Sequence, residues 1–409
     1  MFHCSSKEIN DIRNFSTYSI YIFFFLIITI NYFALFHYSL DFWGRWKIGE
    51  YLINYEHGFI RRGLIGSFYI SIAKVFNFKS VGLTYLIFIS NNIILFFIFF
   101  IVQKIFLAKK NNIDDVILFF SPAFILFCFY SFQAAYRKEI IIFLSFSILS
   151  YALIKNNHFS FKLICLSLFF FIIGLFSHEL TIFVLPFFLF QFLKYKDQKR
   201  FIFSSIFILF TLISLCINFY FSLDTNHNIS ITNKICNSLT ELGYSQKMCA
   251  PLVAGINLSI LDYISNTKEY YPFLLKTYIP LLILSLFPVL ISNWILNKKN
   301  LLIMIIGFFS LLPMFILATD WGRIINVYVF LLFIMILSDE KKFFFILNFK
   351  NLKIKFLIII FYISLWSLPY SFDRPVYSIK ETSFYSIKKS LVFFPITFVK
   401  DYYKYRNKT

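Results

Sequence analysis

The stretch VGLTYLIFISNNIILFFIFFIV at residues 81–102 decides the fold class, because it runs without a single charged side chain. A helix needs about 20 predominantly apolar residues to cross the roughly 30 Å hydrocarbon core of a bilayer. Similar stretches recur along the chain, which is 59% hydrophobic and only 14% charged. Soluble domains carry about a quarter charged residues. The sequence therefore predicts an all-α protein, a polytopic bundle of helices integral to a membrane.

The bundle is expected to hold about 11 transmembrane helices, within a range of roughly 10 to 12. Lipid offers backbone groups no hydrogen-bond partners, so every span must be helical. The spans form one domain over 1–370, and a basic amphipathic tail follows at 371–409. The segment Leu64–Phe78 could be a further membrane-embedded piece. The expected spans are residues 18–40, 81–102, 114–131, 140–154, 161–177, 180–193, 201–221, 273–296, 301–318, 324–337 and 354–370.

The distribution of Lys and Arg sets the expected orientation. With the N-terminus inside, the inner segments are richer in basic residues per position than the outer ones, as the positive-inside tendency requires. An odd number of spans, however, would place the basic tail outside, against this tendency. The main outer loops are then 41–80 and the medium-sized polar loop 222–271. Cys236 and Cys249 share the second loop, and they could form a disulfide if it faces an oxidising compartment.

The net charge of +19 does not indicate a nucleic-acid partner, because Lys concentrates in short loops between spans, where it fixes topology. The chain contains no CxxC, HExxH, P-loop or GxGxxG motif. No metal and no cofactor are therefore expected. There is also no DxD pair to hold a metal–nucleotide-sugar, and Asp114-Asp115 is typical of a helix N-terminal cap. A cytoplasmic nucleotide-sugar transferase loses support.

Five polar clusters fall at the outer ends of spans in this topology. Charged groups at such positions are costly unless they are solvated or paired, and they often mark a substrate path. The convergence on one side is the main functional signal of the sequence. The clusters are Asp41–Trp46, Glu56–Gly66, Tyr136–Glu139, His178–Glu179 and Asp320–Arg323.

Arg61 and Arg62 lie outside, against the positive-inside tendency, which points to a bound anion. The planar fork of Arg suits phosphate, because it bonds two oxygens at once. The neighbouring glycines, Gly58, Gly63 and Gly66, could let the backbone approach a ligand closely. The alternative is that the two arginines simply anchor the chain at the membrane surface.

The other clusters also allow two interpretations. His178-Glu179 could supply a general base or contact an acceptor sugar, or it could be a capped hairpin turn. Arg137-Lys138-Glu139 could form an internal salt bridge at a helix start. Asp320 and Arg323 could pair with each other across one helical turn.

The many spans, the apolar composition, the outer loop, and the motifs GFIRRGLIG (58–66) and DWGR (320–323) together resemble Wzy-type O-antigen and capsule polymerases. The resemblance implies joining of sugar repeat units carried on undecaprenyl pyrophosphate at the outer face of the bacterial inner membrane. That family places arginines in large outer loops, whereas 222–271 has none. Substrate binding would therefore fall to Arg45, Arg61, Arg62, Arg137, Lys138 and Arg323, and catalysis to His178, Glu179 and Asp320.

The partners implied by this resemblance are the undecaprenyl-pyrophosphate-linked glycan, membrane lipid and a chain-length regulator. Four other functions remain open. A single-sugar transferase with a lipid-phosphate donor could use Asp41, Glu50 or Glu56 as its acid. A flippase for lipid-linked oligosaccharides would more often show repeated halves, and none is found. An O-acetyltransferase could use Arg45 and His57, and a purely structural membrane protein needs no site.

Overall fold

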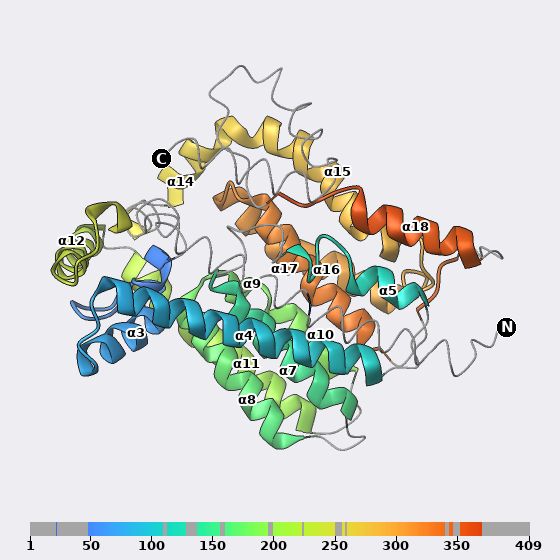
Figure 1. Ribbon diagram of the computed structural model, residues 1–409, viewed down its shortest axis with the longest axis horizontal. Helices are drawn as coiled ribbons and strands as arrows, with labels where there is room; N and C mark the ends of the chain where they lie inside the picture. Colours follow the sequence, from blue (N-terminus) through green and yellow to red (C-terminus); the bar gives the residue numbers. More distant parts are fainter. Residues whose placement is uncertain are drawn as a thin grey trace. The chain divides into compact units, whose positions relative to one another are not determined.

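The computed structural model is helical in each of its two compact units (Figure 1). The first unit comprises Met1–Lys104 and Tyr136–Tyr263, and the second comprises Ile105–Ala135 and Ile264–Thr409. Within the described residues the only extended pairing is a single bridge between Ser292 and Phe345. The structure describes residues 22, 48–108, 113–127, 137–155, 160–194, 199–222, 225–249, 256–257, 260–339, 343–346 and 352–369. The expected tail 371–409 lies outside them, and the single domain over 1–370 stays a prediction.

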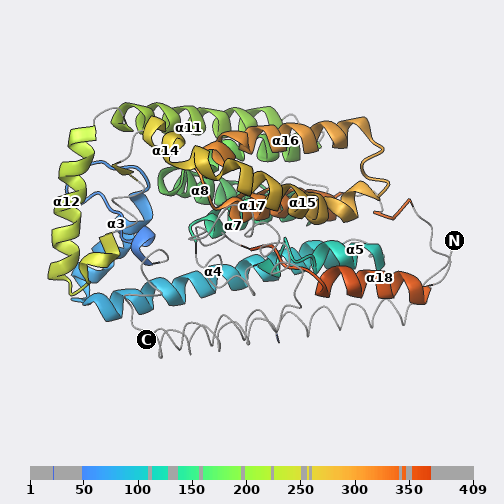
Figure 2. The same ribbon diagram turned by 90° about the horizontal axis from the view of Figure 1, so that it is seen from above.

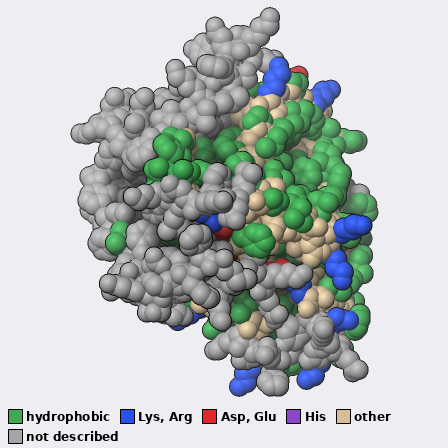
Figure 3. Space-filling model, turned by 90° about the vertical axis from the view of Figure 1, so that its right-hand side faces the viewer, with side chains coloured by type: hydrophobic (Ala, Val, Ile, Leu, Met, Phe, Trp, Pro, Cys, Tyr) green, Lys and Arg blue, Asp and Glu red, His purple; other side chains and the backbone are tan. Residues whose placement is uncertain are grey.

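Among the described residues, four helices are long and apolar enough to cross a membrane, by length and composition. This agrees with the predicted class of helical membrane protein, because each covers the roughly 30 Å of hydrocarbon. Much of the described surface on the face in Figure 3 is hydrophobic, as lipid-facing helices require. The four are α4 (Ser80–Ala108), α11 (Lys199–Ser222), α15 (Tyr271–Leu290) with the short η2 (Lys268–Tyr270) before it, and α16 (Lys298–Leu317).

The predicted hairpin around His178 is present in the first unit. Helices α7 (Glu139–Lys155) and α8 (Phe161–Ser177) pack against each other. Ser145 and Ser167 join them, since each hydroxyl donates to the other residue's carbonyl at 2.8 Å. After His178-Glu179 the chain turns back, so this element is two helical arms and not one long span.

The returning arm is itself divided where the sequence predicted one helix over 180–193. It consists of α9 (Leu180–Phe183) and α10 (Leu185–Leu193), with Val184 between them. Pro186 lies in the first turn of α10. Proline has no N–H and its ring clashes with the carbonyl four residues earlier, so a continuous helix cannot pass through it undistorted.

Two other predicted spans are shorter than expected. The span predicted over 114–131 is interrupted: α5 (Ile113–Phe119) ends early, and turns occupy residues 122–126. Residues 128–131 lie outside the described part of the chain. Pro122 explains the stop, because the residue before a proline is pushed out of the helical region. The span 273–296 ends with α15 at Leu290. The span 18–40 lies outside the described residues, apart from residue 22.

The remaining helices of the second unit are α17 (Trp321–Leu337) and α18 (Leu352–Ser364). Every residue of α17 is buried, as expected for a helix that is apolar on all sides. Asp114 and Asp115 lie in the first turn of α5, as predicted for a helix start. Asp114 also pairs with Lys355 of α18 at 2.5 Å, so this carboxylate ties two helices of the unit together.

The loop predicted over 222–271 is largely helical. It contains α12 (Thr225–Glu241), η1 (Gln246–Cys249) and α14 (Ile260–Thr267). Figure 2 shows α12 running from the end of α11 to the start of α4, where Ser80 N donates to the Leu242 carbonyl at 2.9 Å. The helical period was visible in the sequence, because the buried residues recur at helical spacing. These residues are Asn228, Ile231, Thr232, Ile235 and Leu239.

The segment Leu64–Phe78, predicted as a possible embedded piece, forms α3 (Leu64–Val75). Twelve residues of helix span about 18 Å, which is too short to cross a bilayer. Its buried side packs in an apolar cluster with residues 48–60 and with α12. This cluster fixes the segment that carries Arg61 and Arg62.

Candidate functional site

Three of the five predicted clusters meet in the first unit, around the bend before α3 that we call the arginine turn (residues 60–63). Arg62 Nε lies 2.6 Å from Glu179 Oε2, and an Arg61 terminal nitrogen lies 3.8 Å from Glu179 Oε1. All three side chains are partly exposed, at 16% for Arg61, 20% for Arg62 and 17% for Glu179. Two guanidinium groups therefore share one carboxylate at a place that a ligand can reach.

Glu179 is ionised in this arrangement. Burial by itself would raise the pKa of its carboxyl, but the charges of Arg62 and Arg61 outweigh burial and hold the pKa below its ordinary value. The position of Glu179 follows from the hairpin, because it stands directly before α9. An anion that took over both arginines would remove the cause of this lowered pKa.

The backbone of the arginine turn is supported from the protein interior by Lys138. Its Nζ donates to the Arg62 carbonyl oxygen at 2.7 Å, and the residue is only 1% exposed. Burial lowers the pKa of Lys138 from its ordinary value of 10.5 to about 7. Arg62 has a φ of 68°, in the left-handed region that is costly for a residue with a side chain. Lys138 and Glu179 together hold Arg62 in this conformation.

Arg137, predicted as a substrate ligand, is engaged inside the unit. One of its terminal nitrogens lies 2.5 Å from Glu50 Oε1, and both side chains are nearly fully buried. A buried charge needs such a partner, because an unpaired one costs several kcal/mol. The described ion pair of Arg137 is therefore with Glu50, a residue outside the Arg137-Lys138-Glu139 cluster, and a salt bridge within that cluster stays a prediction.

His178 serves as a cap in the hairpin. Its Nδ1 accepts a 3.1 Å hydrogen bond from the Leu180 backbone N–H, and its Nε2 lies 3.3 Å from Glu139 Oε1. Because Nδ1 accepts, the hydrogen of the neutral ring is on Nε2, facing the carboxylate. With 1% exposure, the imidazole is not placed to take a proton from a ligand. The geometry agrees with the capped turn and leaves Glu179 as the accessible member of the pair.

Asp320 and Arg323 lie in the second unit and contact each other. Arg323 Nε lies 3.2 Å from Asp320 Oδ2, one turn apart at the start of α17. This is the pairing that the sequence offered as the alternative to a substrate role. Arg45 and the cluster around it lie outside the described residues. The arginine turn is thus the described place where charged side chains from several of the predicted clusters come together with partial exposure.

The glycines of the motif pack against the protein itself, and the interpretation that they make room for a ligand is wrong for Gly66 and Gly63. A Cβ on Gly66 would lie 1.8 Å from the Ile53 carbonyl oxygen. A Cβ on Gly63 would lie 2.2 Å from the Tyr55 ring. The space beside each glycine is therefore filled by the segment that precedes the turn.

Sequence reasoning missed three contributors to this site. Glu50 entered only as a candidate acid for a single-sugar transferase, and nothing in the pattern linked it to Arg137. Tyr55 Oη donates to the Phe176 carbonyl at 3.3 Å, which ties the arginine turn to the end of α8. The Ile256 carbonyl accepts a 3.2 Å hydrogen bond from Arg61. Contacts to backbone carbonyls from distant segments leave no signal in sequence spacing.

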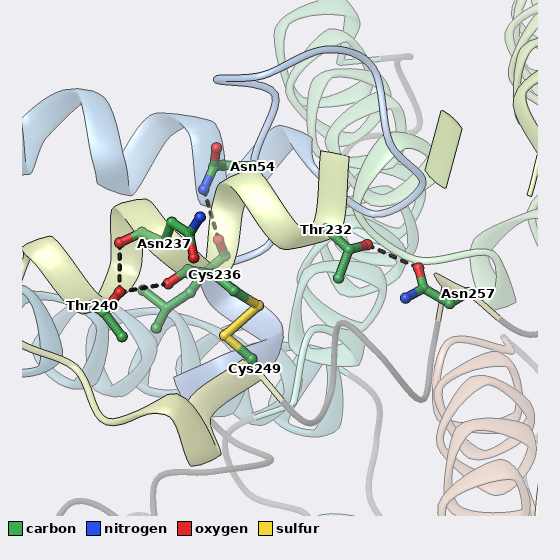
Figure 4. Close-up of a disulfide and its surroundings, with 8 residues drawn as sticks. Asn54, Thr232, Cys236, Asn237, Thr240, Cys249 and Asn257 are labelled. Carbon is green, nitrogen blue, oxygen red and sulfur yellow. Dashed lines mark hydrogen bonds between the residues drawn. A yellow bond between two sulfur atoms is a disulfide. The ribbon is translucent and has the colours of Figure 1, made fainter. Parts of the chain in front are cut away.

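The predicted disulfide between Cys236 and Cys249 is formed in the structure (Figure 4). It joins α12 to η1, with the two Cα atoms 5.7 Å apart. Cys165 and Cys216 are free thiols.

Among the described residues, no group of three or more His, Cys, Asp or Glu side chains could hold a metal ion. No family model, curated protein or solved structure matches the chain.

Proposed function

We propose that this protein polymerises oligosaccharide repeat units carried on undecaprenyl pyrophosphate, at the outer face of the bacterial inner membrane. The product would be an O-antigen or capsular polysaccharide. The proposal places the donor pyrophosphate at the arginine turn, and it includes the multi-pass topology of about 11 spans expected from the sequence.

The observation that carries the proposal is the sharing of Glu179 by Arg61 and Arg62. The two guanidinium groups lie beside this carboxylate at a partly exposed place, so an anionic ligand can approach both of them. Arg is the side chain best suited to bind phosphate oxygens in pairs. Lys138 is buried and contacts the Arg62 carbonyl oxygen, so it holds the turn in the conformation that presents the two arginines. A pyrophosphate group fits this combination of charge and donors.

The chemical step needs a leaving group and a base. An acceptor hydroxyl oxygen attacks the anomeric carbon of the donor sugar, and the bond from that carbon to the pyrophosphate oxygen breaks. Undecaprenyl pyrophosphate leaves with the electron pair, and Arg61 and Arg62 stabilise the charge that develops on it. The proton of the attacking hydroxyl passes to Glu179, whose carboxylate the pyrophosphate has displaced from the arginines.

The membrane setting is supported by the four long apolar helices and by the disulfide. Structural disulfides persist in oxidising compartments, so the Cys236–Cys249 bridge favours a position of α12 outside the cytoplasm. The arginine turn packs against α12 and would lie on the same side. Membrane lipid and a chain-length regulator are the further partners of the proposal.

A single-sugar transferase has less support, because the acids proposed for it in the described residues are paired. Glu50 contacts Arg137, and Glu56 Oε1 lies 2.5 Å from Lys74 Nζ. The two functions differ in product. Loss of a polymerase leaves single complete repeat units on the cell surface, whereas loss of a transferase leaves an incomplete unit and loss of a flippase leaves none.

The test is complementation of a deletion strain with variants, followed by electrophoresis of the surface glycan and a blot for protein level. Arg61→Lys and Arg62→Lys should shorten or abolish the polymer ladder, because an ammonium cannot reproduce the bidentate fork. Loss of one charged contact costs about 2–3 kcal/mol, roughly 30- to 150-fold in binding. Glu179→Gln should leave single repeat units.

The matched control is Arg200→Lys at the start of α11, which the proposal does not use. It should give a normal ladder. A normal ladder from the Arg61→Lys/Arg62→Lys double variant, at normal protein level, would overturn the proposal. The arginines would then be anchors at the membrane surface.

A further inference from the structure

Helix α12 is joined to the segment 249–257 by two contacts, which we call clasps, on one of its faces. Cys236 forms the disulfide with Cys249, and Thr232 Oγ1 donates to Asn257 Oδ1 at 2.9 Å. Thr232 and Cys236 are four residues apart, so they project from the same side of the helix. Figure 4 shows both clasps along α12. Together they fix the chain at residues 249 and 257 relative to the helix.

The residue next to the second clasp reaches the arginine turn. Ile256 is 2% exposed, and its side chain belongs to the apolar cluster beneath α12. Its carbonyl oxygen accepts the hydrogen bond from a terminal nitrogen of Arg61 at 3.2 Å. The orientation of the Arg61 guanidinium therefore depends on where the clasped chain holds this carbonyl.

Helix α12 also contacts residues 57 and 58, which precede the arginine turn. Ser238 Oγ of α12 lies 2.8 Å from His57 Nε2, four residues before Arg61. Gly58, beside His57, lies against Ile231 of α12 so closely that a Cβ would be 2.8 Å from the Ile231 side chain. Contacts from α12 thus reach the segment before the turn and, through residue 256, the Arg61 side chain itself.

We infer that the Cys236–Cys249 disulfide is a positioning element for Arg61, acting through the Ile256 carbonyl. This inference rests on the proposed function only for the identity of the ligand that Arg61 binds. The positioning of Arg61 does not depend on the proposed function. Without the disulfide, the described contacts that hold this carbonyl are the Thr232–Asn257 hydrogen bond and the packing of the Ile256 side chain, so the carbonyl gains freedom to move. Arg61 keeps Glu179 at 3.8 Å but loses a fixed hydrogen-bond partner, so its guanidinium group becomes more accessible to solvent.

Arginine modification tests the inference without any polymer assay. The full-length protein in detergent is treated with phenylglyoxal before and after reduction by a phosphine, and mass spectrometry gives the modification rate of each arginine. The rate at Arg61 should rise several-fold on reduction. The rate at Arg200 should not change, because α11 separates it from α12 by about 30 Å.

Variants provide the second arm. Cys236→Ser should raise Arg61 modification as reduction does, and Thr232→Val should raise it to a smaller extent. Cys165→Ser and Cys216→Ser, which remove the free thiols of the described residues, should have no effect. Because reduction acts on protein that is already folded, a folding defect in Cys236→Ser does not obscure the result.

An unchanged Arg61 rate after reduction, with complete alkylation of Cys236 and Cys249 as proof that the bridge is open, overturns the inference. Such a result leaves the proposed function standing. A raised Arg61 rate together with a normal polymer ladder from Cys236→Ser supports the positioning and removes Arg61 from the proposed mechanism. The two proposals therefore fail separately.

Discussion

Lys138 and Arg62 meet at a backbone carbonyl: the buried ammonium of one donates at 2.7 Å to the carbonyl oxygen of the other. The carbonyl belongs to a residue in the left-handed conformation, with φ at 68°. A strained residue persists only where its surroundings enforce it. A buried Lys directed at the peptide group is such a constraint, and it links the start of α7 to the arginine turn.

Lys138→Met should flatten the pH dependence of stability. Because the folded pKa is lowered to about 7, the unfolded chain binds more protons between roughly pH 7 and 10.5. The free energy of unfolding of the wild type therefore rises with pH across that window. Below about pH 7 the buried ammonium lowers the free energy of unfolding by its full amount. Thermal unfolding in detergent at several pH values measures this. Equal slopes for wild type and Lys138→Met would contradict it.

His178→Asn should keep the hairpin, whereas His178→Ala should weaken it. The Asn side-chain oxygen can accept from the Leu180 N–H in place of Nδ1, and Ala cannot. Loss of that bond should destabilise the protein by about 1 kcal/mol. Both melting temperature and polymer ladder should be compared. Loss of polymer in well-folded His178→Asn would mean that the ring transfers a proton.

Gly66→Ala should prevent normal folding, and Gly82→Ala is its control. The new methyl at Gly66 would overlap the Ile53 carbonyl, which is backbone and cannot rotate away. Overpacking of this kind costs about 1–3 kcal/mol or more. At Gly82 the nearest atoms are 3.4 Å away, so Ala fits in α4 and adds helix propensity. Protein yield in the membrane and thermal unfolding report the difference, and similar yields would refute the packing argument.

Single substitutions at Glu50 or Arg137 should be far more harmful than the double one. Glu50→Met leaves the Arg137 charge buried without this carboxylate, and Arg137→Met does the reverse, at about 3–5 kcal/mol each. Glu50→Met/Arg137→Met removes both charges at similar volume and should recover most of the loss. A double-mutant cycle from thermal unfolding measures the coupling. Additive losses would show that the pair is not energetically linked.

The helices that sequence reasoning located best are those with long uninterrupted apolar runs. The spans 81–102 and 201–221 each lie within one helix, and the span 301–318 differs from α16 by one residue at its end, because length and apolar composition are sufficient signals there. Two of the errors fall at prolines. Pro122 and Pro186 stop or divide apolar runs that composition alone made continuous. A hydropathy average does not register that proline lacks a backbone N–H, so it cannot predict where a proline ends a helix.

The sequence predicts which charged residues belong to the site, but it does not predict which of them form ion pairs with each other. Arg61, Arg62, Lys138 and Glu179 were singled out as charges in apolar surroundings, and the structure brings them together. Which acid met which base depended on tertiary packing, as the Glu50–Arg137 contact shows. The many polar residues of 225–241 favour a loop, whereas the few apolar positions at helical spacing are the ones that α12 buries.

The length of α4 has a consequence for how the protein sits in a lipid bilayer. Its 29 residues span about 43 Å, whereas the hydrocarbon layer is roughly 30 Å thick. At a typical tilt of about 20° the helix still emerges by roughly 10 Å. The charge-free part from Ser80 to Gln103 covers about 34 Å at this tilt, so a hydrocarbon layer a few ångströms thicker than about 30 Å still does not reach Lys104. Hydrophobic mismatch should therefore change the tilt of α4 before it disturbs the packing at either end.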